Sequence, residues 1–322
     1  MSDTGAVFRA MHKRGNPFTL MNAWDVGTAK VLEALGADAI GTTSSGHAFT
    51  LGLPDMGHVS RDQAMGHAQD LVAAVSIPVS GDLENGYGDD PDTVAQTVRL
   101  AGEIGLAGCS IEDTQMARPI SAYGFDLAVE RVKAGVSAAR TLGRDFVFVA
   151  RADGLMNGLY DIEEAIRRLR AFDAAGADCL YAPLPETLDD LKRIIECTDK
   201  PVNVLAVGPY AKFSRKDYAA MGVARISLGS GLARVIHTQI IGAGRKMIAE
   251  GDFTDILGAA PGRDTETPCR PRHQRVWRKN QGFGFWRWGC HRAGWHRSAN
   301  LWPWCAFRRR AWCQRAKARH RG

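Results

Sequence analysis

Acidic side chains follow several strand-like segments of the sequence, in positions where they could bind a cation. In GDLENGYGDD (residues 81–90), Asp82 and Glu84 come directly after an apolar run, and Glu112 ends another one. The residues expected at these strand ends are six carboxylates and one arginine: Asp55, Asp82, Glu84, Glu112, Asp113, Asp153 and Arg151. Carboxylates gathered at one site repel one another unless a cation is bound. Oxygen ligands without a nearby His/Cys cluster suit Mg²⁺ or Mn²⁺.

Some of this acidity has a simpler explanation. Asp89, Asp90 and Asp92 flank a proline at the start of a helical segment, so we interpret them as helix caps or partners of the helix dipole. Asp82 and Glu84 instead lie on or just past a strand with a glycine-rich turn behind them, which favours a ligand role.

Glu112 and Arg151, at the ends of two other predicted strands, are interpreted separately. Glu112 ends an otherwise apolar strand, where a carboxylate without a partner is costly to bury, so a functional role is favoured. Arg151 is either an ion-pair partner of the acidic set or a clamp for a substrate carboxylate, because its planar fork suits both.

The elements that position these residues form one repeating unit, a buried strand followed by an amphipathic helix that often closes on glycine. The predicted strands are Thr19–Trp24, Ala39–Thr43, Pro78–Asp82, Gly108–Glu112, Phe146–Arg151, Cys179–Ala182, Val202–Ala206 and Arg225–Leu228. The predicted helices are Val26–Leu35, Arg61–Val75, Pro91–Ile104, Leu127–Leu142, Ile162–Ala175, Leu188–Cys197, Arg215–Met221 and Leu232–Ala249. This pattern indicates an α/β fold, a (β/α)8 TIM barrel whose active site lies at the carboxyl ends of the strands. An open doubly wound sheet is the competing architecture.

Composition divides the chain at Pro261–Gly262. Residues 263–322 contain 16 of the 41 Lys and Arg but 2 of the 35 Asp and Glu, a charge of +14, so residues 1–262 carry 25 − 33 = −8. This basic tail also holds seven of the eight tryptophans and shows no helical or strand period. We therefore predict a barrel domain over 1–262 and an irregular basic tail over 263–322, which is disordered or translated in a shifted reading frame.

Several classes of protein are disfavoured by composition. No stretch approaches the roughly 18 uninterrupted apolar residues of a membrane span, and the N-terminus lacks the apolar core of a signal peptide. The seven cysteines include no CxxC pair, so neither a disulfide framework nor a zinc site is indicated. We expect a cytoplasmic enzyme with reduced thiols.

Five segments, taken together, resemble the isocitrate lyase/phosphoenolpyruvate mutase superfamily. They are NAWDVGTAKVLEALGADAIGTTSSG, LGLPD, GDLENGYGD, GCSIEDTQ and ARADG, and the resemblance covers roughly residues 15–255. It implies a Mg²⁺-dependent barrel that forms or cleaves C–C or P–C bonds through an enolate of a pyruvate-like 2-oxo acid. Such an enolate oxygen is stabilised by a metal that acts as a Lewis acid.

The resemblance also implies roles for individual residues. Asp82 and Glu84 would hold Mg²⁺ directly or through water, with Glu112 as a further ligand. Arg151 would bind the substrate carboxylate, and Ser44, Ser45 and Gly46 would hold the pyruvoyl end, with Asp55 at the reaction centre. From their positions at strand ends, Glu186 and Asn203 are weaker predictions as substrate contacts.

One departure from the family pattern narrows the expected function. Lyases that cleave isocitrate or methylisocitrate carry a cysteine in a KRCGH or KKCGH segment after the fourth strand, where this chain reads DTQMARPISAYG. The Asn-Ser pair typical of the phosphonate mutases is absent too. We expect a lyase that cleaves a C–C bond of a small 2-oxo or 2-hydroxy dicarboxylate, as an oxaloacetate decarboxylase or a substituted-malate lyase does. Mutase-like P–C chemistry is the alternative.

Two non-enzymatic functions, nucleic-acid binding by the tail and an inactive scaffold, are less well supported by the sequence. The basic, Trp-rich tail could bind nucleic acid on an inactive barrel, but it has no recognisable nucleic-acid-binding motif. A catalytically dead scaffold is opposed by the intact acidic set. The expected partners are therefore a small carboxylate substrate and further copies of the chain, because members of the resembled superfamily form dimers or tetramers.

Overall fold

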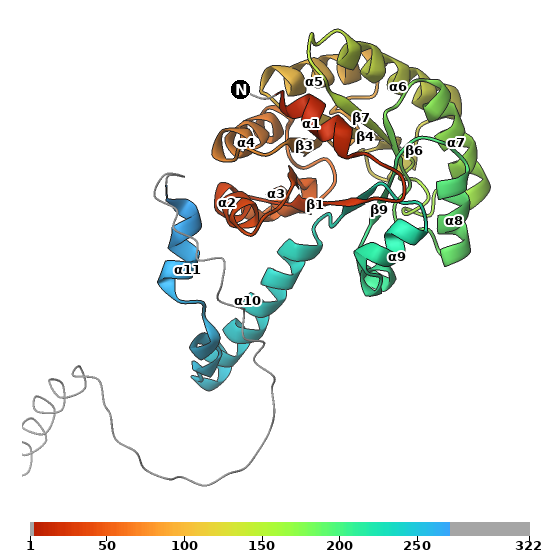
Figure 1. The fold of residues 1–322 in the computed structure, drawn as a ribbon. Helices are drawn as coiled ribbons and strands as arrows, with labels where there is room; N and C mark the ends of the chain where they lie inside the picture. The colour runs from red at the N-terminus through yellow and green to blue at the C-terminus, as the bar shows by residue number, and fades with distance from the viewer. Residues whose placement is uncertain (1–2, 271–322) are drawn as a thin grey trace, which may run out of the picture. The chain divides into compact units, whose positions relative to one another are not determined.

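The structure, a computed structural model, describes residues 3–270. Eight parallel strands close into a barrel in the order β1-β10-β9-β8-β7-β4-β3-β2 (Figure 1). The strands are β1 (Phe18–Asn22), β2 (Ala39–Gly41), β3 (Val79–Asp82), β4 (Gly108–Glu112), β7 (Val147–Arg151), β8 (Cys179–Tyr181), β9 (Val202–Leu205) and β10 (Arg225–Ser227). The predicted (β/α)8 barrel is confirmed, since the sheet has no open edge.

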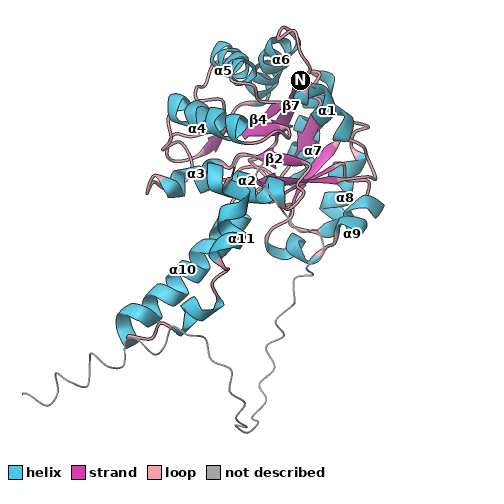
Figure 2. Cartoon of the chain, turned by 60° about the vertical axis from the view of Figure 1, so that its left-hand side comes forward, coloured by secondary structure: helices cyan, strands magenta, loops and turns pink. Residues whose placement is uncertain are grey.

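Helices follow the strands and surround them (Figure 2). They are α2 (Val26–Ala34), α4 (Arg61–Ala74), α5 (Pro91–Glu103), α6 (Phe125–Arg140), α7 (Ile162–Ala174), α8 (Leu188–Glu196), α9 (Arg215–Ala220) and α10 (Gly231–Glu250). Every predicted strand and helix is found, with ends that differ by at most two residues. Within the barrel, the elements that were not predicted are the helices α1 (Thr4–Met11) and α3 (Ser44–Thr50), the 3-10 helix η1 (Gly208–Lys212) and the hairpin of β5 (Thr114–Gln115) with β6 (Ser121–Ala122).

Side-chain caps fix where the outer helices begin. At the start of α5, Asp90 accepts a hydrogen bond from the Thr93 N–H, and Pro91 follows as the first helical residue. The capping interpretation is therefore confirmed for Asp90. Asp92 lies in the first turn of α5, as a partner of the helix dipole does. Asp89 is not the cap, and its side chain accepts a hydrogen bond from the Tyr123 hydroxyl at 2.7 Å.

The barrel interior has an apolar lower layer. Side chains from the strands pack there with Phe8 of α1, which places α1 against the amino ends of the strands. A Cβ atom on Gly108 would lie 3.2 Å from the Phe8 ring, so a glycine is needed for this close approach. The strand residues of this cluster are Phe18, Leu20, Ala39, Val147, Val149, Cys179 and Tyr181. This layer closes the amino end of the barrel and leaves the carboxyl end open.

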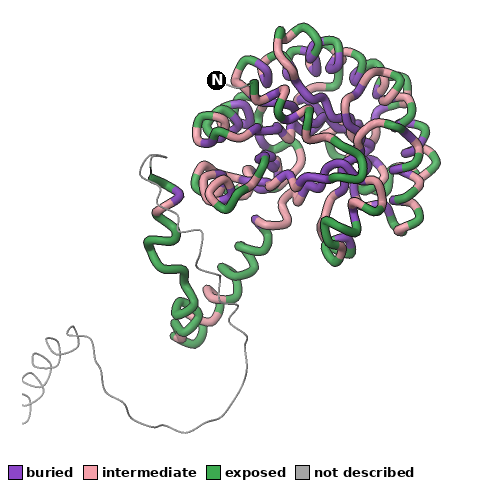
Figure 3. The backbone as a smooth tube through the Cα atoms, viewed as in Figure 1, coloured by how far each residue is buried: buried purple, intermediate pink, exposed green. Residues whose placement is uncertain are grey.

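The last barrel helix and the segment after it are mostly exposed. Helix α10 buries a single residue, Ala233 (Figure 3). After it come the 3-10 helix η2 (Thr254–Gly258), the short helix α11 (Gly262–Glu266) and the 3-10 helix η3 (Thr267–Cys269), which packs against α2. The remainder of the predicted tail, 271–322, lies outside the described residues, so its nature stays a prediction. No helix within residues 3–270 combines the length and apolarity needed to cross a bilayer.

Candidate active site

A cavity of about 250 Å³ opens at the carboxyl ends of the strands. It extends into the barrel because the inward positions above the apolar layer carry small residues, among them Gly41, Ser80, Ser110 and Ser227. This volume suits a small organic acid, being below the roughly 300–1,000 Å³ of drug-sized sites. Of the residues predicted to act at the site, Ser44, Ser45, Asp55, Asp82 and Arg151 line the cavity.

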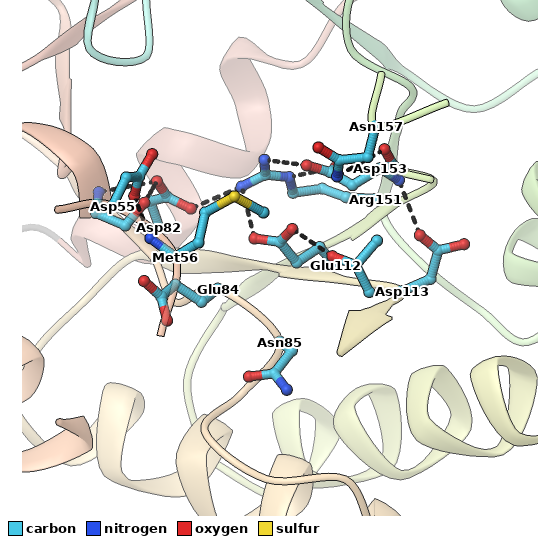
Figure 4. A network of polar contacts seen from close by, with 12 residues as sticks. Asp55, Met56, Asp82, Glu84, Asn85, Glu112, Asp113, Arg151, Asp153 and Asn157 are labelled. Atoms are coloured by element: carbon cyan, nitrogen blue, oxygen red, sulfur yellow. Dashed lines mark hydrogen bonds and ion pairs between the residues drawn. The ribbon is translucent and has the colours of Figure 1, made fainter. Parts of the chain in front are cut away.

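Arg151, the last residue of β7, is the centre of the site's ion-pair network (Figure 4). Its Nε and Nη2 donate to the two carboxylate oxygens of Asp153 at 2.8 and 2.6 Å. Its Nη1 donates to Asp82 Oδ1 at 2.7 Å and lies 3.9 Å from Glu112 Oε1. Burial opposes the charge of Arg151, but the carboxylates around it hold its pKa well above the usual range. The guanidinium is therefore a fixed cation that reaches the cavity.

Asp82, the last residue of β3, links this cation to the loop after β2. Its Oδ2 accepts hydrogen bonds from both the backbone N–H and the hydroxyl of Ser44, at 3.0 and 2.9 Å. Its own N–H donates to Thr42 Oγ1 at 2.7 Å. Three donors, from the ends of β2 and β7, thus fix the orientation of this carboxylate.

Glu84 is a buried carboxylate with few partners. Both of its oxygens face one donor, the Gly57 N–H, at 3.3 and 3.2 Å. Burial, opposed by this hydrogen bond and reinforced by Asp82 and Asp55, raises the pKa of Glu84 to about 7. The backbone is strained here, because Glu84 has a φ of 45° and the nearby Met56 a φ of 70°. Such strain clusters at functional sites.

Glu112 and Asp113 differ in their surroundings although they are adjacent. Glu112 Oε2 accepts a hydrogen bond from Thr114 Oγ1 at 2.8 Å, and burial raises its pKa well above the usual value. Asp113 points to a separate group, accepting hydrogen bonds from Tyr160 and from Arg168 at 2.7 and 2.9 Å. Asp113 therefore supports the β7–α7 loop, and Glu112 faces Arg151.

Asp55 and helix α3 form one wall of the cavity. Asp55 Oδ1 accepts from the Met56 N–H at 2.9 Å, and burial raises the pKa of this carboxyl. Gly46 does not line the cavity. Its N–H donates to Thr43 Oγ1 at 3.2 Å, and a Cβ atom there would lie 3.0 Å from Trp24 Cβ. Gly46 thus lets α3 pack closely, and its role as a substrate contact stays a prediction.

Asn203 and Glu186, the two weaker predictions of a substrate contact, lie in different parts of the structure. Asn203 is buried inside the barrel, where it accepts from Arg225 Nε and donates to Ser227 Oγ, both at 2.9 Å. Glu186 is exposed on the β8–α8 loop and is not among the cavity-lining residues, whereas Leu184 of the same loop is. Glu186 as a substrate contact remains a prediction.

Comparison with known proteins decides the family. The family model described as phosphoenolpyruvate phosphomutase matches residues 8–248. The chain belongs to this family. An uncharacterized protein of Mycobacterium tuberculosis is 35% identical over 227 residues, covering 69% of this chain and 81% of that one. The 2,3-dimethylmalate lyase of Eubacterium barkeri is 31% identical over 201 residues, covering 60% of this chain and 68% of the lyase.

A solved structure agrees with this assignment. A candidate lyase/mutase from Burkholderia cenocepacia J2315 is 42% identical, with a TM-score of 0.78, and the match covers 82% of this chain and 94% of that one. The predicted superfamily, and with it the prediction of an enzyme, is confirmed by these matches.

Mg²⁺ fits the donor set of this phosphoenolpyruvate mutase family member. Within residues 3–270, no three Asp, Glu, His or Cys side chains lie close enough together to hold a metal ion as a cluster. Mg²⁺ often takes only one or two carboxylates and keeps several waters. Glu84 is a buried carboxylate with one weak donor, and Asp82 and Asp55 are close enough to raise its pKa. Asp82 and Glu84 would hold the ion directly or through water, and its charge would relieve the repulsion among these carboxylates.

The raised pKa of Glu84 predicts an unusual stability profile for the metal-free protein. The folded state holds this proton more tightly than the unfolded state, so its contribution to stability is lost as pH rises through about 7. Glu84→Gln is neutral and keeps an acceptor for Gly57. In EDTA it should be about 1–3 kcal/mol more stable than wild type in urea unfolding at pH 8, and nearly equal to it at about pH 4, below the ordinary carboxyl pKa. A difference that is the same at both pH values would contradict the burial of a carboxylate here.

Sequence reasoning missed part of the site inside the barrel. Tyr181, Leu205 and Arg225 all line the cavity from strand positions that face inward. The alternation of strand residues could have identified them, since each lies an even number of residues from another inward-facing position. Arg225 had the clearest signal, being a charged residue in the predicted strand Arg225–Leu228.

Proposed function

We propose that this protein is a Mg²⁺-dependent lyase that cleaves a C–C bond of a small 2-oxo or 2-hydroxy dicarboxylate through a pyruvate-like enolate. The observation that carries the proposal is the arrangement at the cavity mouth. There, a buried arginine held by Asp82 and Asp153 faces the same small cavity as Ser44, Ser45 and Asp55. The 31% identity to a 2,3-dimethylmalate lyase supports this reaction class.

The chain's own residues have separate tasks in this proposal. Arg151 carries a guanidinium at a fixed place, so it can bind the carboxylate next to the reacting carbon without reorganising. Ser44 and Ser45 line the adjacent wall and orient that end of the substrate. Asp55 has a raised pKa and reaches the cavity, which suits a base that removes a hydroxyl proton near neutral pH.

A metal ion would supply the Lewis acid that these residues lack. Asp82 and Glu84 would hold Mg²⁺ or Mn²⁺ directly or through water, with Glu112 as a further ligand. When bound, the ion acts as a Lewis acid that stabilises negative charge on an enolate oxygen. Its place among otherwise repelling carboxylates is also the reason to expect dependence on a divalent cation.

Release of a 2-oxo acid tests the proposal. Purified protein with Mg²⁺ is given oxaloacetate, malate, 2-methylmalate and 2,3-dimethylmalate, and the 2-oxo acid is detected with a coupled dehydrogenase. At least one compound should be cleaved, EDTA should stop the reaction, and Mg²⁺ or Mn²⁺ should restore it. Turnover of phosphonopyruvate alone would instead favour P–C chemistry.

Isocitrate and 2-methylisocitrate are expected to be poor substrates. The loop that carries a cysteine in the lyases for those compounds here forms the β5–β6 hairpin, and residues 110–178 contain no cysteine. Cys179 lies in the apolar layer, and burial raises the pKa of its thiol to about 11, so it cannot replace the missing acid. Rapid release of succinate from either compound would refute this expectation.

We also propose that the enzyme is a homodimer or homotetramer. Helix α10 exposes a row of apolar side chains that a second copy would cover: Val235, Ile236, Ile240, Ile241 and Ile248. Replacing Ile240 and Ile241 with Asp should lower the molecular mass measured by light scattering to that of one chain. Thr238→Asp, also on the exposed part of α10, is the control for added charge. Unchanged mass in the Ile240/Ile241 variant would contradict the proposal.

A further inference from the structure

The floor of the cavity carries a second arginine that the proposed mechanism does not use. Arg225, the first residue of β10, is 3% exposed and lines the cavity. It faces the barrel interior beside Phe18 and Asn203, its partners in the parallel sheet. It therefore lies below the mouth residues Asp82 and Arg151, toward the closed end of the barrel.

The surroundings of Arg225 do not satisfy its charge. Its Nε donates to Asn203 Oδ1 at 2.9 Å, but its Nη1 is buried without any hydrogen-bond partner. Among the described residues no carboxylate forms an ion pair with it, in contrast to Arg151, which contacts three. A buried cation without a counter-charge is unfavourable, so the site is suited to receive an anion.

The guanidinium is also held in place. Asn203, which accepts from Arg225, is itself fixed by its hydrogen bond to Ser227. This arrangement fixes the plane of the guanidinium before any ligand binds. Its paired N–H donors are then oriented to bind the two oxygens of a carboxylate.

We propose that Arg225 binds the distal carboxylate of the substrate and thereby selects substituted malates over oxaloacetate. The proposal rests on the proposed function and deepens it. The substrate is then a 2-hydroxy dicarboxylate whose C1 carboxylate lies at Arg151 and whose C4 carboxylate lies at Arg225.

The selection follows from where charge develops. In malate cleavage the 2-hydroxyl gives its proton to Asp55, the C2–C3 bond breaks, and the electron pair moves onto C3 and its carboxylate. C3 then takes up a proton, which balances the one lost from the hydroxyl. The enolate formed is that of the C3–C4 acid, whereas a pyruvate enolate forms in oxaloacetate decarboxylation. The products are a 2-oxo acid and a monocarboxylic acid, and no co-reactant is needed. Negative charge on the C4 carboxylate rises during bond breaking, so Arg225 stabilises the transition state more than the ground state. In oxaloacetate decarboxylation the same carboxylate loses its charge as CO₂, and Arg225 would hold back the reaction.

The test compares Arg225→Gln with wild type in the full chain with Mg²⁺. Malate and oxalate binding are measured by calorimetry, and cleavage of 2,3-dimethylmalate and oxaloacetate by 2-oxo acid release. Arg225→Gln should weaken malate binding and kcat/KM for 2,3-dimethylmalate by about 100-fold. Oxalate has no C4 carboxylate, so its affinity should change less than about threefold, and oxaloacetate turnover should stay equal or rise.

Stability and a second variant separate this role from a structural one. Removing an unpaired buried cation should leave the melting temperature unchanged or higher, whereas a structural Arg225 would lower it. Arg225→Lys should recover part of the malate affinity, because it keeps the charge without the fork. Equal malate affinity in wild type and Arg225→Gln, or an equal loss for oxalate, would overturn the proposal. Absence of all cleavage by wild type would refute the proposed function, and the binding data would still decide the role of Arg225.

Discussion

Replacing Asp82 with Asn is expected to abolish divalent-metal-dependent turnover, with a fall in kcat of about 1,000-fold or more. The side chain lies between Arg151 and Ser44 and is, with Glu84, a proposed ligand of the metal ion. Asn keeps the size and one acceptor oxygen but removes the negative charge. Mg²⁺ affinity, measured by calorimetry, should fall at least about tenfold.

Asp90→Asn is a matched control for Asp82→Asn. Asp90 caps α5 outside the cavity, and Asn is an equally good cap. Asp90→Asn should therefore keep both metal affinity and kcat. If Asp82→Asn also kept both, the metal site would have to lie elsewhere.

The second large effect concerns Arg151. Arg151→Lys should lower kcat/KM by about 100- to 1,000-fold, because an ammonium cannot donate in parallel to Asp153 and still reach Asp82 and the substrate. Most of this loss should appear in substrate binding and orientation, and Mg²⁺ affinity should change much less than in Asp82→Asn.

Stability distinguishes this loss from simple misfolding. Lys keeps a positive charge among Asp82, Glu112 and Asp153, so the variant should remain folded by circular dichroism. Arg151→Met would leave these carboxylates buried without a cation and should cost about 3–5 kcal/mol in urea unfolding at neutral pH. An Arg151→Lys variant with wild-type KM and kcat would exclude Arg151 from the substrate site.

The barrel could be predicted because the buried strand runs, the helical periodicity and the glycines at helix ends all indicate the same fold. The buried run Gly108–Glu112 follows a glycine turn and is followed by polar residues, so both of its ends were predicted correctly. The other strands were predicted to within two residues at each end. Helix α3 was missed because Ser-Ser-Gly has a low helix propensity, and it forms only because Thr43 caps it and Trp24 packs against it.

The site was predicted as a set of residues but not as a set of contacts. Asp82 and Arg151 were both identified, yet they come from β3 and β7, which have β4 between them, and only the closed sheet brings their side chains to 2.7 Å. The isolation of Arg225 was harder to foresee, because it depends on no neighbouring strand placing a carboxylate within ion-pair distance of its guanidinium. Local sequence patterns carry no information of that kind.

The apolar layer beneath the cavity, completed by Phe8 of α1, has a kinetic consequence. A chamber closed at one end has a single route for both entry and departure. If Arg225 binds the distal carboxylate as proposed, the fragment at the Arg151 end must leave before the one held deeper at Arg225, so product release should be ordered. The fragment that leaves last should compete directly with the incoming substrate, and the first should not.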